Sequence, residues 1–235
     1  MKLIEDYLSG MKTIFFGGTC ILMLITVYLI FMWVPTEQNL GISQRIFYVH
    51  VPLGWIGMVS ILVVGIASVG HLCTRNNTWD AVAYSAAELG VIFATLILIT
   101  GAVWAKPVWG VWWSWDPKLT TTLILWFIYV GYLMVRSFSI PGSQGRRYAS
   151  VVALLGAIDA PIIYMASIWW RTAHPNLNIG PLAEADSDLD GKMYITFFVS
   201  LVTFTVFYVY LMLERIQMRK IEDDLDEVHQ YVSLT

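Results

Sequence analysis

The sequence contains little charge. Only 13% of its 235 residues are Asp, Glu, Lys or Arg, whereas 57% are hydrophobic. A soluble domain carries roughly a quarter charged residues, so this composition excludes an ordinary soluble domain and predicts an integral membrane protein. The formal net charge of −3 is less informative than the distribution of Lys and Arg among the loops, which sets the orientation in a membrane.

Cysteine and phosphate-binding motifs are also scarce. The chain has two cysteines, Cys20 in an apolar run and Cys73 in a short loop, and neither belongs to a CxxC, CxxCH or zinc-type pattern. Redox and metal–thiolate chemistry are therefore not expected. The sequence also lacks a Gly-rich loop of the Walker type, so any use of ATP would depend on a partner protein.

Long apolar runs, in contrast, are abundant. A hydrocarbon core about 30 Å thick requires roughly 20 apolar residues per helix. Six stretches meet this requirement and predict an all-α, single-domain bundle of six transmembrane helices across residues 1–235. They are approximately 14–34, 50–70, 81–105, 119–136, 148–170 and 193–213. The first is too long for the apolar core of a cleaved signal peptide, so we interpret it as a retained helix.

The basic residues predict the orientation of this bundle. With six spans, both termini lie on one side of the membrane, and that side would carry nine of the fourteen Lys and Arg residues. By the positive-inside rule the termini are expected in the cytoplasm of a bacterium. The cytoplasmic tail is expected at 214–235, and its stretch IEDDLDEVHQ is expected to be solvated and mobile. The loops 35–49, 106–118 and 171–192 then face the periplasmic side of the inner membrane.

Tryptophan is concentrated in the second of these outer loops, where residues 109–116 read WGVWWSWD. Residues spaced by three, four and seven positions share one face of a helix. A short amphipathic helix within 106–118 would thus group most of the indole rings and one carboxylate: Trp109, Trp112, Trp113 and Asp116, with Trp115 alongside. Asp116 followed by Pro117 predicts the N-cap and first position of the next helix.

The same tryptophans raise a question of function. Single tryptophans such as Trp104 are interpreted as part of an interface belt, because Trp favours the membrane–water boundary. Four tryptophans within eight residues, outside the spans, fit that interpretation poorly. They favour a flat aromatic surface for a large planar ligand.

Two of the four histidines flank the same outer surface. His50 begins the second span in YVHVP, and His174 follows the fifth span in WWRTAHPN. Imidazole is a common axial ligand of haem iron, so the pair predicts a haem held between two histidines without a covalent thioether. The haem propionates would need cations, and the candidates are Arg45 first, then Lys118, Arg171 and Lys106.

These motifs resemble those of a known protein family. WGVWWSWDPKLT resembles the WWD motif of the haem-handling proteins of cytochrome c biogenesis, and the histidine motifs are similar to those of its cytochrome c maturation protein C (haem exporter protein C) family. The resemblance covers nearly the whole chain, including the six spans and the position of the motif between the third and fourth. One departure is Lys118, where the family usually has arginine, because lysine keeps the charge but lacks the bidentate fork.

The resemblance implies a haem-transfer protein rather than an enzyme, at most assisting covalent attachment of haem to a partner. It implies non-covalent haem b at the periplasmic face, with His50 and His174 as axial ligands. The implied partners are a membrane-anchored periplasmic haem chaperone of the CcmE type, and an ABC-type ATPase with its membrane partners, of the CcmA, CcmB and CcmD types.

Two other function classes stay open. A membrane b-type cytochrome would be expected to bury its histidines at membrane depth, whereas both histidines here lie at span ends. A small-solute transporter would show polar residues along a midplane path. Asp159 in the fifth span is such a residue, although we favour a local role in satisfying the backbone that Pro161 loosens. Glu88 in the third span is assigned no role.

Overall fold

The computed structural model contains six long α-helices within residues 2–139, 143–170, 172, 174 and 190–234, which are the residues the structure describes. They are α1 (Lys2–Tyr28), α2 (Phe47–Thr74), α3 (Asn77–Trp109), α4 (Pro117–Phe138), α5 (Ser143–Trp169) and α6 (Gly191–Leu234). Each includes a stretch long and apolar enough to cross a membrane. The prediction of an all-α integral membrane protein with six spanning helices is therefore confirmed.

Short local signals set the helix ends. A left-handed Arg75, with φ 57°, ends α2, and Asn76 caps α3 by accepting a hydrogen bond of 2.8 Å from the backbone N–H of Thr78. Between α1 and α2, a π-helical turn, η1 (Leu29–Trp33), and a 3₁₀ turn, η2 (Ile42–Ile46), reverse the chain. These compact connections force neighbouring helices to run antiparallel.

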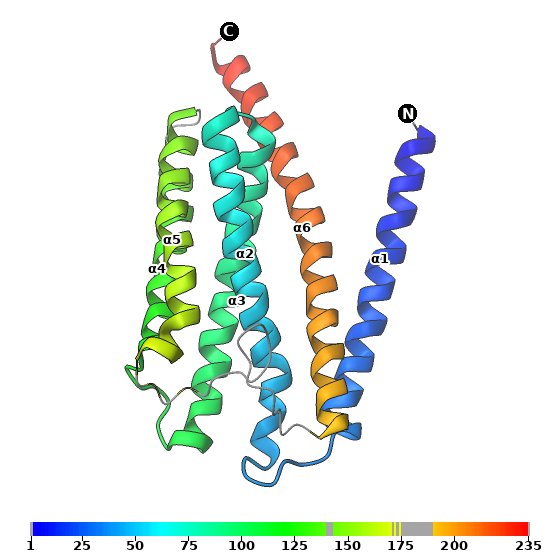
Figure 1. Cartoon of the computed structure of the whole chain (residues 1–235). Coiled ribbons are helices and arrows are strands. Elements are labelled where there is room, and N and C mark those ends of the chain that lie inside the picture. The colour runs from blue at the N-terminus through cyan, green and yellow to red at the C-terminus, as the bar shows by residue number, and fades with distance from the viewer. Residues whose placement is uncertain (1, 140–142, 171, 173, 175–189, 235) are drawn as a thin grey trace.

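Figure 1 shows the resulting arrangement, with both chain termini at the same end of the bundle. We call this the terminal end, and we call the opposite end, which carries residues 110–116, the tryptophan end. Helix α2 contacts α3, α5 and α6, helix α4 packs on α3 and α5, and α1 packs mainly on α6. Towards the terminal end, α1 diverges from α6 (Figure 1).

Small residues allow the helices to approach closely, as is typical of membrane bundles. A Cβ atom on Gly65 of α2 would lie 3.0 Å from the Cβ of Ala157 in α5, and one on Gly156 would lie 2.7 Å from the Tyr129 ring in α4. The main core lies where α2, α3, α4, α5 and α6 meet. Its buried members include Ile56, Val64, Phe93, Ala153 and Phe204.

The prediction of a short amphipathic helix in the tryptophan-rich segment is wrong. Helix α3 continues through Pro107 to Trp109 and ends where Gly110 adopts φ 78°, and residues 110–116 are not helical. Gly110 takes this left-handed conformation without the steric cost of a Cβ atom. Because Pro117 disfavours helical geometry in the residue before it, Asp116 is extended, at φ −64° and ψ 142°.

The segment expected to be a mobile tail is helical as well. Helix α6 runs without interruption from Gly191 to Leu234, a length of 44 residues. The part beyond the predicted span therefore continues the transmembrane helix, and its charged side chains pair with other helices, as described below.

Candidate functional site

His50 lies in the first turn of α2 and faces α3. Its Nδ1 atom is 2.9 Å from Oγ1 of Thr100, and that hydroxyl in turn donates a hydrogen bond of 2.8 Å to the Leu96 carbonyl. A hydroxyl has one proton to donate. The Thr100 hydroxyl therefore accepts from His50 Nδ1–H, and this network assigns the tautomer in which Nε2 carries the free lone pair.

The rest of the His50 environment also comes from α3. The indole of Trp104 meets the imidazole edge-on, with ring centroids 5.6 Å apart. A Cβ atom on Gly101 would lie 3.1 Å from Cε1 of His50, so a glycine there leaves room for the ring. Three residues of one helix turn thus fix the position of His50.

His174 is held by the motif aspartate through an intervening threonine. The backbone N–H of His174 donates to Oγ1 of Thr172 at 3.1 Å, and Thr172 donates its own proton to Oδ2 of Asp116. The other carboxylate oxygen, Oδ1, accepts from the backbone N–H of Lys118 at 3.0 Å. Asp116 is 8% exposed, and it both caps α4 and ties His174 to the tryptophan-rich segment. The predicted N-cap and Pro117 at the first helical position are confirmed.

The structure brings the two histidines into one neighbourhood. His50 contacts Thr100 and Trp104 in the last turns of α3. Trp109, the last residue of α3, lies edge-on to His174 with ring centroids 6.4 Å apart. Each histidine therefore lies beside a tryptophan from the end of α3.

Several buried polar atoms at the tryptophan end have no hydrogen-bond partner within the described part of the chain. They are Nε of Arg45, Nε1 of Trp104, Nε1 of Trp113, Oγ of Ser114 and Oγ1 of Thr120. A buried polar group left unpaired costs about 1–3 kcal/mol. Three of the five groups are N–H donors, which suit a bound ligand with anionic acceptors such as carboxylates.

The remaining predicted site residues are more exposed to solvent. Trp112 and Trp115 are 59% and 76% exposed, and Trp115 meets Trp113 edge-on at 5.8 Å. The amino group of Lys106 lies 6.0 Å from the Trp112 ring and donates to the Gly110 carbonyl at 2.9 Å. The four tryptophans of the motif thus do not share one helical face. Arg171 lies outside the described residues.

Three residues of this site were not predicted. Thr100 and Trp104 are four positions apart, so they lie on the same face of α3, and both contact His50. Trp104 thus has a specific partner in the site, which its interpretation as part of an interface belt did not include. Thr172 was missed because its two contacts, with Asp116 and His174, depend on how the chain folds after α5.

Comparisons with known proteins agree with the motifs. The family model described as heme exporter protein C matches residues 4–230. The heme exporter protein C of Bradyrhizobium diazoefficiens is 35% identical over 195 residues, covering 83% of this chain and 73% of the relative. That of Haemophilus influenzae is 32% identical over 190 residues, covering 81% and 76%. With a match along nearly its whole length, this chain belongs to the heme exporter protein C family.

Proposed function

We propose that this protein holds haem b non-covalently, as cargo, at the tryptophan end and delivers it to a partner during the biogenesis of c-type cytochromes. The observation that carries the proposal is the state of His50. Its Nδ1–H is engaged by Thr100, which leaves Nε2 as a preorganised ligand, and His174 lies beside Trp109, five residues along α3 from the Trp104 that contacts His50. The names of its relatives, heme exporter protein C, support haem as the cargo.

In this proposal His50 and His174 are the axial ligands. Haem brings an iron whose two axial positions accept imidazole nitrogens. A histidine that ligates a metal usually donates its other ring N–H to a fixed acceptor, which orients the ring and raises its basicity. Thr100 is that acceptor for His50, and the Asp116–Thr172 pair positions the backbone of His174.

The propionates would be bound by donors that the protein itself leaves unpaired. The Nε atom of Arg45 and the indole Nε1 atoms of Trp104 and Trp113 are buried and have no partner within the described residues. Lys118, whose backbone N–H donates to Asp116, adds a positive charge to this end of the bundle, and Arg171 remains a further candidate. The tryptophans Trp109, Trp112, Trp113 and Trp115 would provide apolar contact for the porphyrin.

The position of the site favours transfer over electron transport. His50 lies in the first turn of α2 and His174 follows α5, so a haem between them would lie at the edge of the membrane. The excess of Lys and Arg at the terminal end supports assigning that edge to the periplasmic side of a bacterial inner membrane. A periplasmic, membrane-anchored chaperone of the CcmE type would receive the haem, and an ABC-type ATPase with membrane partners (CcmA, CcmB and CcmD types) would supply ATP hydrolysis.

The haem content of the purified protein tests this proposal. We expect the wild-type protein from haem-replete cells to retain haem b that acidified organic solvent extracts, as befits non-covalent binding. His50→Ala and His174→Ala should each lose most of it. His229→Ala is the matched control, because His229 lies exposed on α6 far along the chain from the site, and it should retain haem. Equal haem content in all four proteins would contradict the assignment of the ligands.

A further inference from the structure

Helix α6 continues well beyond its apolar span. The apolar stretch of this helix ends near residue 213, and residues 214–234, here called the α6 extension, remain in the same helix. At a rise of 1.5 Å per residue these 21 residues extend the helix by roughly 30 Å. Figure 1 shows the extension at the terminal end, in line with the rest of α6.

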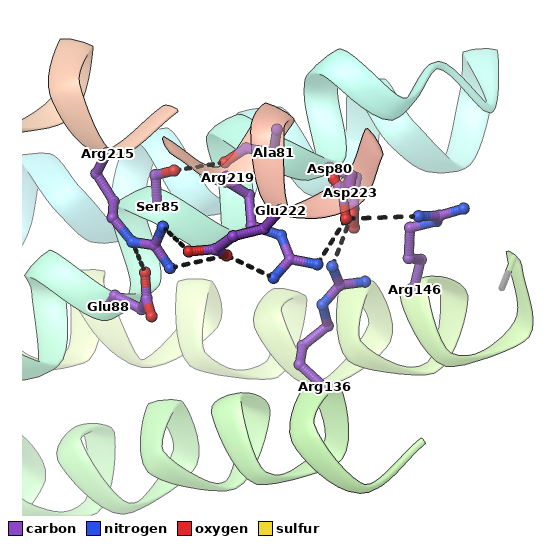
Figure 2. Close-up of polar contacts among 10 residues, drawn as sticks. All are labelled: Asp80, Ala81, Ser85, Glu88, Arg136, Arg146, Arg215, Arg219, Glu222 and Asp223. Carbon is purple, nitrogen blue, oxygen red and sulfur yellow. Dashed lines mark hydrogen bonds and ion pairs between the residues drawn. The ribbon is translucent and has the colours of Figure 1, made fainter. Parts of the chain in front are cut away.

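Ion pairs fix the base of the α6 extension to the bundle, as Figure 2 shows. They join it to α3 and α5, and they also link successive turns of the extension itself. The pairs are Arg215–Glu88, Arg215–Glu222, Arg219–Glu222, Arg219–Asp223 and Arg146–Asp223. The Arg219 guanidinium also stacks over the Tyr84 ring of α3 at 4.4 Å. The bundle therefore sets the orientation of the base of the extension.

A different face of the extension carries an exposed apolar stripe. Met218, Ile221, Leu225 and Val228 are 55%, 51%, 53% and 57% exposed. Their spacing of three, four and three residues is that of the buried seam between packed helices. We call these four residues the α6 stripe.

Helix α1 does not cover the outer part of the α6 stripe, Leu225 and Val228, and the α6 extension does not lie flat on the membrane surface. A helix that crosses the bilayer and continues straight cannot also lie in the plane of the interface, where amphipathic surface helices bind. Helix α1 reaches the base of the extension, where Lys12 lies 3.1 Å from Glu214, but it diverges from α6 towards the terminal end (Figure 1). Leu225 and Val228 remain exposed in its presence.

Charge indicates what kind of helix would cover the stripe. Residues 221–235 include five acidic residues and neither Lys nor Arg. Two of the five, Glu222 and Asp223, already pair with arginines, and the segment keeps a net negative charge. Two packed helices lie 8–10 Å apart, which is about one Debye length at physiological ionic strength. Two copies of this segment would therefore repel each other, whereas a basic helix would be attracted.

We propose that the α6 stripe docks a helix of another protein, one with an apolar seam flanked by Lys and Arg. The stripe would supply the apolar contact, and the acidic residues beside it, such as Asp224, would pair with the basic flanks and set partner choice. The ion pairs with α3 and α5 would hold the docked helix in a fixed position relative to the bundle. This inference does not depend on haem binding.

The test uses the full chain in nanodiscs of zwitterionic phosphatidylcholine. The probe is a fluorescent three-heptad peptide with Leu at its a and d positions and Lys at e and g, and its comparator has Glu at e and g. We expect saturable binding of the Lys peptide by anisotropy and at least roughly tenfold weaker binding of the Glu peptide. The double variant Leu225→Gln, Val228→Gln should weaken binding of the Lys peptide by about tenfold or more.

A matched control is Lys220→Gln, an exposed position outside the stripe on the same helix, which should not weaken binding. Size-exclusion profiles and circular dichroism should show that each variant is folded. The proposal is overturned if the Lys peptide does not bind, if both peptides bind equally, or if the double variant binds as the wild type does. A dimer in sedimentation experiments that the double variant dissociates would assign the stripe to a second copy instead, and it too would overturn the proposal.

Discussion

At the scale of single residues, one hydroxyl group determines the orientation and the tautomer of the His50 imidazole. Thr100 Oγ1 accepts from Nδ1–H because its own proton is used by the Leu96 carbonyl. Thr100→Val keeps the shape of the side chain and removes the acceptor, so the imidazole loses both its orientation and its fixed tautomer. Losing such a supporting contact typically costs 10–100-fold in metal affinity. We expect haem affinity, measured by quenching of tryptophan fluorescence, to fall by about that factor.

The control for this prediction is Thr205→Val. Thr205 also donates to a carbonyl one turn back in its helix, and it accepts a hydrogen bond from Trp55 rather than from a histidine. Haem affinity should be unchanged in this variant. An unchanged affinity in Thr100→Val would instead show that the Thr100 contact does not prepare His50 for binding.

A second prediction at this scale concerns Thr172. Its hydroxyl links Asp116 to the backbone of His174, so Thr172→Val should release His174 while the cap of α4 remains. We expect haem to dissociate about tenfold faster from Thr172→Val, measured by transfer of haem to excess apomyoglobin. Thr172→Ser retains the hydroxyl and should behave like the wild type. If haem dissociated from Thr172→Val and Thr172→Ser at the same rate, the hydroxyl would have no part in holding His174.

The sequence predicts the candidate ligands and the cap of α4, but not the residues that contact them. His50, His174 and the Asp116–Pro117 cap are each recognisable from residue type and position along the chain. Thr100 and Trp104 lie about fifty residues from His50 in sequence, and they matter only because α2 packs against α3. That contact depends on which faces of two helices meet, and no local pattern in the chain specifies it.

At the scale of elements, small residues decide how closely the helices pack. A Cβ atom on Gly156 would meet the Tyr129 ring at 2.7 Å, whereas nothing lies within 4 Å of the corresponding position on Gly131. Gly156→Ala should therefore push α5 away from α4 and destabilise the protein by about 1–3 kcal/mol. Gly131→Ala should be neutral or slightly stabilising, because alanine favours the helix.

Thermal unfolding in detergent, followed by circular dichroism, distinguishes these two glycine variants. Gly156→Ala should unfold at a lower temperature than the wild type, and Gly131→Ala at the same or a higher one. Equal unfolding temperatures would mean that the α4–α5 interface adjusts to the added methyl group without cost.

Element boundaries were predicted less well than the elements themselves. Apolar length identified six helices, since a run of about 20 apolar residues has few alternatives to a membrane span. The prediction of a helix from the spacing of the tryptophans failed, because Gly110 ends α3 and Pro117 keeps Asp116 extended. The α6 extension was missed for the opposite reason. Its acidic residues resemble a solvated tail, but several of them are partners of arginines.

At the scale of the whole molecule, the two ends of the bundle are built differently. The tryptophan end gathers two histidines, exposed indoles and unpaired buried donors. The terminal end is held by ion pairs that connect α3, α4, α5 and α6, including the buried pair of Arg136 and Asp80 at 2.9 Å. One end is thus suited to bind and release a ligand, and the other to fix the helices relative to one another.

Electron paramagnetic resonance of the ferric, haem-loaded protein tests the bis-histidine site most directly. Two imidazole ligands make ferric haem low-spin, so the wild-type protein should give a low-spin signal. His50→Ala and His174→Ala should each convert the haem they retain to a high-spin signal, and added imidazole should restore the low-spin one. A wild-type signal that is high-spin, or that neither substitution changes, would contradict a haem held between His50 and His174.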